Sequence, residues 1–194
     1  MKKIKIGFVG ASHLGVCSAI AAAEKNFNIV LFDTSSKIIK NLNRLKIDFY
    51  EPKLKELLKK NKKKILLTNN ANFLKECKIV YISHDTPTND NNVSNFNSIN
   101  NIINKVIKHL NKNTLMVIMC QAYPGFTEKI NWNKGKLFYQ VETLIFGKAI
   151  KRAIKPEQII IGKSKSCKKE TIKLLESFVK KFSNNIKYMS YKSS

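Results

Sequence analysis

The sequence has little of what would split it or anchor it in a membrane. Its 194 residues include seven glycines and four prolines, and no Pro/Gly/Ser-rich stretch divides them. A run of roughly 18 or more apolar residues, the length that a membrane span requires, is also absent. Lys2 and Lys3 lead directly into a β-like alternation, which is not the pattern of a signal peptide. We therefore expect one domain over residues 1–194 and no membrane as partner.

Cysteine motifs are absent as well. The four cysteines, Cys17, Cys77, Cys120 and Cys167, are scattered without C-x-x-C or Cys/His metal spacing. Three of the four lie in apolar settings typical of buried free thiols. This pattern predicts a reducing, cytoplasmic location and no metal site.

Acidic residues and arginine are scarce. The 13 acidic residues face 36 basic ones, for a formal net charge of +23, and only Arg44 and Arg152 are arginines. Lysines are spread over residues 53–64, 105–112 and 163–181, where Phe178 is the one Phe, Tyr or Trp residue, whereas base readers favour arginine. We interpret them as solvated helix faces rather than a nucleic-acid surface, although a cationic surface attracts an anionic nucleotide.

The most informative feature that is present is a glycine turn near the N-terminus. The apolar run 4–9 stops at Gly10, an Ala-rich helical stretch over 17–24 follows Gly15, and a second apolar run covers 29–32. Strand, glycine turn, helix and strand in this order open a dinucleotide-binding fold, in which a pyrophosphate lies at the helix N-terminus. Ser12 occupies the position of the usual middle glycine, where its hydroxyl is a potential phosphate donor.

Asp33 follows the second strand about 20 residues after the glycine turn, where a carboxylate accepts hydrogen bonds from the adenosine ribose. The negative charge repels a 2′-phosphate, so the cofactor expected is NAD. Lys37 is a nearby cation compatible with the 2′-phosphate of NADP, so NADP stays an alternative.

The rest of the chain alternates between strand-like and helix-like segments. We expect strands at 65–68, 79–82, 114–119, 137–141, 159–161 and 186–189, and helices or turns at 36–45, 52–60, 72–76, 96–110 and 171–182. The Asn-rich segment 89–97 and residues 121–125 read as loop and turn. The pattern predicts an α/β fold, a Rossmann-like, doubly wound, mostly parallel sheet with helices on both faces. Ligands of such sheets bind at the carboxyl ends of the strands.

Several motifs in this order resemble the N-terminal domain of the UDP-glucose/GDP-mannose 6-dehydrogenase family, over essentially the whole chain. The motifs are residues 7–15, Asp33, 50–52, 85–88, 120–127, 139–144, 147–150 and 159–162.

The resemblance implies an enzyme that oxidises the C6 hydroxyl of a nucleotide sugar to a carboxylate with two NAD⁺ in succession. It implies acid/base handling of water by Glu142 and a further catalytic position at Gln121. The cofactor-binding positions that it implies are Gly10, Ala11, Ser12, His13, Leu14, Gly15, Asp33, Asp85, Thr86, Pro87 and Cys120.

The sequence also departs from the family pattern. Val141 and Tyr123 replace prolines, Phe146 stands where many members have a second glutamate, and Ile38 stands where a cation is common. The family's cysteine motif, catalytic lysine and asparagine, central helix and nucleotide-sugar domain all lie downstream of the matched region. We therefore expect no turnover without a C-terminal half as partner, and a homodimer only if the central helix is supplied.

For several of these residues an ordinary structural role remains open. His13 is also read as an ordinary helix-start residue, Glu142 as an exposed carboxylate and Cys120 as a buried thiol. His84 has no conventional catalytic counterpart in the family. For the whole chain, the alternatives to half of a nucleotide-sugar dehydrogenase are a stand-alone, non-catalytic NAD-binding module and another NAD enzyme, such as a hydroxyacid dehydrogenase.

Overall fold

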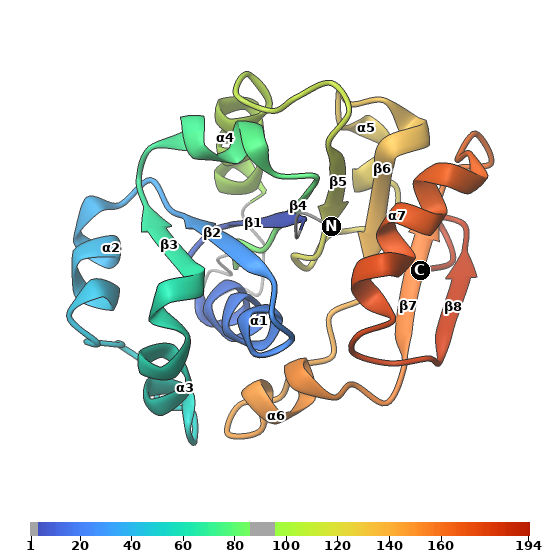
Figure 1. Cartoon of the computed structure of the whole chain (residues 1–194). Helices are drawn as coiled ribbons and strands as arrows, with labels where there is room; N and C mark the ends of the chain where they lie inside the picture. The colour runs from blue at the N-terminus through green and yellow to red at the C-terminus, as the bar shows by residue number, and fades with distance from the viewer. Residues whose placement is uncertain (1–3, 86–95) are drawn as a thin grey trace, which may run out of the picture.

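The computed structural model describes residues 4–85 and 96–194 and contains one eight-stranded sheet (Figure 1). The strands are β1 Lys5–Val9, β2 Asn28–Phe32, β3 Ile65–Thr68, β4 Ile79–Ile82, β5 Leu115–Ile118, β6 Leu137–Gln140, β7 Ile159–Lys163 and β8 Ile186–Met189. Their order is β3-β2-β1-β4-β5-β6-β7-β8. Every neighbouring pair is parallel except β6 and β7. The expected doubly wound, mostly parallel sheet is confirmed.

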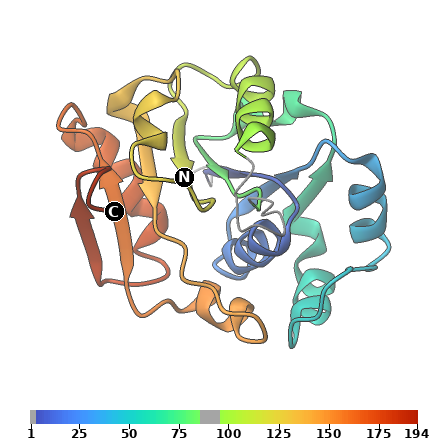
Figure 2. The same ribbon diagram turned by 180° about the vertical axis from the view of Figure 1, so that it is seen from behind.

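Helices cover both faces of the sheet (Figures 1 and 2). They are α1 His13–Glu24, α2 Ser36–Asn43, α3 Leu54–Asn61, α4 Asn97–Ile107, α5 Phe126–Lys129, α6 Ala149–Ile154 and α7 Lys169–Val179. Short 3-10 turns lie at Lys62–Lys64, Ala71–Glu76 and Lys134–Lys136. Buried residues of α1, α6 and α7 share one hydrophobic cluster, and those of α4 and α5 share the other.

The two-residue period of the strands separates these two cores. In β1, Ile6 and Phe8 face the α1 side, whereas Val9 faces the α4 side. All four residues of β4 and all four of β5 are buried, as expected for central parallel strands covered on both faces. The near-continuous apolar runs in the sequence follow from this double burial.

Several predicted boundaries were wrong. Helix α1 begins at His13 rather than at residue 17, because Ser12 caps it inside the glycine turn. Strand β7 extends to Lys163, and α7 covers 169–179 rather than 171–182. Helices α5 and α6 were not predicted, because four and six residues are too short to show a helical period.

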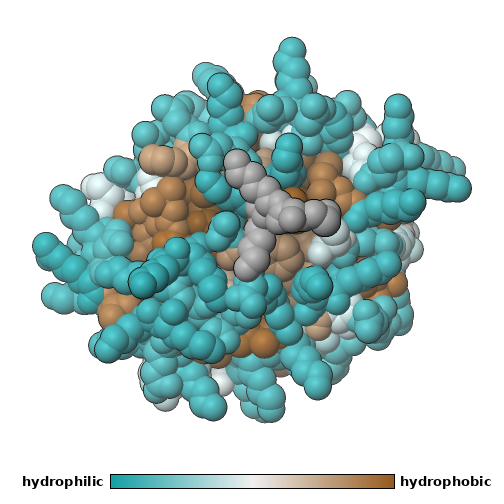
Figure 3. All heavy atoms as spheres, in the orientation of Figure 1, coloured by the Kyte–Doolittle hydropathy of each residue, from teal (hydrophilic) through white to brown (hydrophobic). Residues whose placement is uncertain are grey.

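Hydrophilic side chains project around the periphery of the face shown in Figure 3, with hydrophobic patches between them. In the described residues, no helix is long and apolar enough to cross a membrane. The predicted loop over 89–97 falls mostly outside the described residues, and its last residue, Asn97, begins α4.

Candidate functional site

The turn between β1 and α1 requires glycine at both of its ends. Gly10 has a φ of +101°, and a Cβ there would lie 2.6 Å from the Cα of His84. A Cβ on Gly15 would overlap the carbonyl oxygen of Gly10. The turn therefore packs backbone against backbone, and the N–H groups of the first turn of α1, which lack intrahelical acceptors, form a cradle suited to a phosphate.

Ser12 caps α1 instead of pointing its hydroxyl at a ligand. Its Oγ donates to the carbonyl oxygen of Ser83 at 2.8 Å and accepts a long hydrogen bond from the Gly15 N–H at 3.4 Å. The hydroxyl proton is used within the protein, so a contact from Ser12 to a phosphate would come from its backbone. Ala11 and Leu14 also have buried side chains and offer only backbone to a ligand.

Asp33 joins the glycine turn to the end of β2. Its Oδ2 accepts from the N–H of Ala11 at 2.8 Å, and its Oδ1 accepts from the N–H of Ser35 at 2.8 Å. Asp33 as a whole is 5% exposed. A carboxylate has about four acceptor sites, so two remain for ribose hydroxyls. The buried negative charge also disfavours a 2′-phosphate. This donor and acceptor set fits NAD.

The other predicted residues come from the neighbouring strand ends. Asp85 follows β4 and is exposed, Gln121 follows β5 and is exposed, and Glu142 follows β6 and is half-buried. Since β1, β2, β4, β5 and β6 run parallel, these ends lie along one edge of the sheet. Thr86 and Pro87 lie outside the described residues.

Cys120 lies beneath this edge rather than on it. Its side chain has no exposed surface, and burial raises the pKa of its thiol to about 12. The thiol is therefore neutral, as the buried-thiol interpretation requires. Any contact that it makes with the cofactor would come from its backbone.

Glu142 has the electrostatics of a proton-transfer group. Burial raises the pKa of its carboxyl above the ordinary value, and the nearby charge of Asp85 raises it further. The backbone N–H of Leu144, which donates to Oε1, lowers the pKa, as do the nearby side chains of His13 and Arg152. The net direction is upward, which brings a carboxyl closer to the pH at which acid/base catalysis is efficient.

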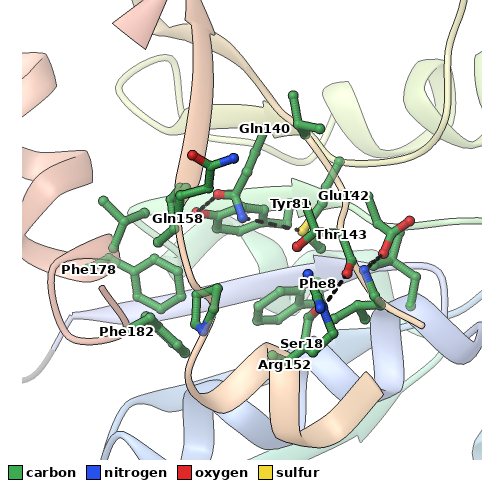
Figure 4. Close-up of a pocket in the computed structure, with 18 residues that line it drawn as sticks. Phe8, Ser18, Tyr81, Gln140, Glu142, Thr143, Arg152, Gln158, Phe178 and Phe182 are labelled. Carbon is green, nitrogen blue, oxygen red and sulfur yellow. Dashed lines mark hydrogen bonds between the residues drawn. The ribbon is translucent and has the colours of Figure 1, made fainter. Parts of the chain in front are cut away.

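A pocket adjoins Glu142 on the α1 side of the sheet (Figure 4). Aromatic side chains from β1, β4 and α7 line it, among them Phe8, Tyr81 and Phe178. Two hydrogen bonds join polar groups of its lining: the Tyr81 hydroxyl donates to Gln140 Oε1 at 3.2 Å, and Arg152 Nε donates to the Thr143 carbonyl at 2.8 Å. The pocket is thus largely apolar, with Glu142 at its polar side.

Sequence reasoning assigned no role to Glu51 or Arg152, although both contact this site. Glu51 accepts a hydrogen bond from His13 Nε2 at 2.8 Å, and Arg152 binds the residue after Glu142. Glu51 belongs to one of the recognised motifs, but nothing in the spacing of the sequence shows which residues it meets. His13 is indeed the first residue of α1, and its ring stacks on Phe146 with a centroid distance of 4.3 Å.

One further buried polar group follows β4. His84 Nδ1 is buried and forms no hydrogen bond within the described residues. Among those same residues, no three or more His, Cys, Asp and Glu side chains gather into a group able to hold a metal.

Comparison with known proteins places these features in a family. Residues 4–182 match the family model described as UDP-glucose/GDP-mannose dehydrogenase family, NAD binding domain. The chain is 29% identical over 168 residues to the UDP-glucose 6-dehydrogenase of Rickettsia typhi, covering 82% of this chain and 39% of that protein.

Solved structures show the same fold. A UDP-D-ManNAc dehydrogenase from Pyrococcus horikoshii superposes with a TM-score of 0.86 at 20% identity, covering 98% of this chain and 48% of that one. A GDP-mannose dehydrogenase from Pseudomonas aeruginosa gives a TM-score of 0.84 at 18% identity, covering 97% and 47%. At these identities the likeness concerns the fold alone.

The chain spans less than half the length of these relatives. The match nevertheless includes the glycine turn, Asp33 and the segment after β6, since it runs from residue 4 to residue 182. The chain therefore belongs to the UDP-glucose/GDP-mannose dehydrogenase family and carries its NAD binding domain, and NAD is its cofactor.

Proposed function

We propose that this chain is the NAD-binding half of a nucleotide-sugar 6-dehydrogenase, a single domain over residues 1–194 that binds NAD and depends on a C-terminal half for turnover. The observation that carries the proposal is that the glycine turn, Asp33 and Glu142 follow the ends of β1, β2 and β6 along one sheet edge. The cofactor cradle and a proton-transfer group thus share an edge. The Rickettsia typhi relative, a UDP-glucose 6-dehydrogenase, supports the reaction class.

In the complete enzyme, NAD would supply the hydride acceptor for oxidation at C6 of the sugar. Asp33 would hold the adenosine ribose, and the N–H groups at the start of α1 would hold the pyrophosphate. Glu142, with its raised pKa, exchanges a proton with the water that hydrolyses the acyl intermediate. Gln121 occupies the next strand end and orients groups near the reacting carbon.

Further groups are required from outside this chain. By family resemblance, the nucleophilic cysteine, a lysine and an asparagine would come from a C-terminal half, which we propose as the partner of this domain. UDP-glucose or a similar nucleotide sugar is the proposed substrate of the assembled enzyme. A cytoplasmic location agrees with the four free cysteines.

Fluorescence titration with NADH tests the binding half of the proposal. Wild type should bind NADH, and Asp33→Ala should bind at least tenfold more weakly, since a buried acceptor of ribose hydroxyls is lost. Asp48→Ala changes the net charge equally at an exposed position and should bind like wild type. Absence of NADH binding to wild type would overturn the assignment.

The second half of the proposal concerns turnover. Wild type mixed with NAD⁺ and UDP-glucose should produce no steady NADH, and steady production would refute the dependence on a second half. Sequencing the DNA beyond codon 194 in all three frames separates half of an enzyme from a stand-alone module. A frame that encodes a long helix with a lysine and then a glycine-rich cysteine motif supports the former.

A further inference from the structure

Glu51 is a buried carboxylate whose three partners lie far from it in the sequence. Its side chain has no exposed surface. Oε1 accepts from the Gly147 N–H at 2.7 Å and from His13 Nε2 at 2.8 Å, and Oε2 accepts from the Ala149 N–H at 3.1 Å. A buried carboxylate is stable only with such partners, and its removal would leave three donors unpaired.

These donors belong to the two parts of the candidate site. His13 is the first residue of α1 and lies within the glycine turn. Gly147 and Ala149 end the segment 142–149, called here the Glu142 segment because it begins with that residue. The His13 ring also lies between two phenylalanines, stacked on Phe146 and edge-on to Phe49 with a centroid distance of 4.9 Å. One carboxylate therefore ties the cofactor turn to the Glu142 segment.

The other end of the Glu142 segment is held through the same helix. The first N–H of α6, on Ala149, binds Glu51, and one turn later Arg152 Nε donates to the Thr143 carbonyl at 2.8 Å. The position of α6 thus fixes the residue next to Glu142. A shift of Glu51 would move the turn, α6 and Thr143 together.

We propose that Glu51 is a positioning residue that couples occupancy of the dinucleotide turn to ordering of the Glu142 segment. The inference rests on the proposed function in one respect, that NADH binds at the glycine turn. A ligand on the N-terminus of α1 restricts the motion of His13. His13 and Gly147 donate to the same oxygen of Glu51. When the motion of His13 is restricted, the hydrogen bond from Gly147 to Glu51 therefore opens less often.

Amide hydrogen exchange, measured residue by residue by NMR with and without saturating NADH, tests the coupling. In wild type, NADH should slow exchange at residues 11–15 and also, by about tenfold, at Gly147 and Ala149. In Glu51→Ala, NADH should still protect the turn but leave Gly147 and Ala149 unchanged. The exposed neighbour Glu56 provides the control, and Glu56→Ala should behave like wild type.

Glu51→Gln sharpens the result and covers the case in which Glu51→Ala fails to fold. A glutamine oxygen in the place of Oε1 still accepts from Gly147 and His13, but its amide then faces the Ala149 donor. Coupling should persist at Gly147 and disappear at Ala149.

Two outcomes overturn the proposal while the proposed function stands: NADH protects the turn of wild type without affecting Gly147 and Ala149, or Glu51→Ala retains full coupling. If NADH protects no residue of wild type, both the coupling and the cofactor assignment are wrong.

Discussion

The glycine turn and the Glu142 segment lie at the same edge of the sheet but are held in different ways. The turn is shaped by close backbone packing, since the Gly10 N–H donates to the Phe32 carbonyl at 2.9 Å and Gly10 lies against the backbone of His84, while the side chains of Asp33 and Ser12 bind N–H groups within it. The Glu142 segment is held by side chains, those of Glu51 and Arg152. A site can therefore combine a part that tolerates almost no substitution with a part that is adjusted through distant residues.

Substitution within the turn should have the largest effect. Gly15→Ala should destabilise the domain by about 3 kcal/mol and abolish NADH binding, because its Cβ would overlap the backbone of Gly10. Urea unfolding and NADH titration measure both effects. Gly125→Ala is the control: its φ of +87° is strained, but nothing lies within 4 Å of the added carbon. Gly125→Ala should lower the free energy of unfolding by about 1 kcal/mol and leave NADH affinity unchanged. Equal effects of Gly15→Ala and Gly125→Ala would contradict the special role of the turn.

The next largest effect is expected at α6. Arg152→Ala should lower the free energy of unfolding by about 1.5 kcal/mol, since it removes the charged donor that binds the Thr143 carbonyl. Urea unfolding measures this value, and hydrogen exchange should show the largest acceleration at residues 143–144, which Arg152 holds, and a smaller one at residues 11–15, which are linked to the segment through Glu51. Lys151→Ala, at an exposed position of the same helix, is the control. Equal acceleration in the turn and at residues 143–144 would contradict a local role of Arg152.

Loss of the helix cap is expected to have a smaller effect. Ser12→Ala should lower the free energy of unfolding by about 1 kcal/mol, because Ser12 Oγ caps α1 and binds the Ser83 carbonyl. NADH affinity should change by less than about threefold, because the hydroxyl is used within the protein. Ser35→Ala removes the corresponding cap of α2 and serves as the matched control in the same unfolding and titration assays. A large loss of affinity in Ser12→Ala alone would place its hydroxyl on the phosphate.

The smallest effect concerns pH. The pKa of Glu142 is raised in the folded chain above the ordinary 4.5, so the folded state holds its proton to higher pH than the unfolded state. The contribution of Glu142 to stability therefore falls as pH rises from about 4.5 through the raised pKa. Glu142→Gln should remove this fall in urea unfolding measured across that range.

Substitution of a neighbour tests the cause of that shift. Asp85→Asn should lower the pKa of Glu142 in a carboxyl NMR titration, because a nearby negative charge disappears. An unchanged or higher pKa would contradict the stated cause.

The strands and the turn were predictable because their signals are local. β3 and β8 have the bounds expected from their apolar runs, and Gly10, Gly15 and Asp33 lie where a βαβ unit requires them. Helix α6 was not predictable, because its N-terminus is capped by Glu51, 98 residues away in the chain, and not by a neighbouring side chain. For the same reason no periodicity indicated that Phe146, at a position where the family often has glutamate, would stack on His13.

The sequence by itself determined the sheet, its mostly parallel order and the chemistry of the cofactor turn. The signals for these features are the spacing of apolar residues, the glycines of the turn and the polar residues that follow each strand, and each signal extends over only a few residues. Tertiary structure alone decided that the Ser12 hydroxyl is turned inward to Ser83. It also decided that Glu51 joins His13 to the Glu142 segment. These outcomes depend on which distant groups compete for each donor, acceptor and apolar surface, and only the packed chain brings those groups together.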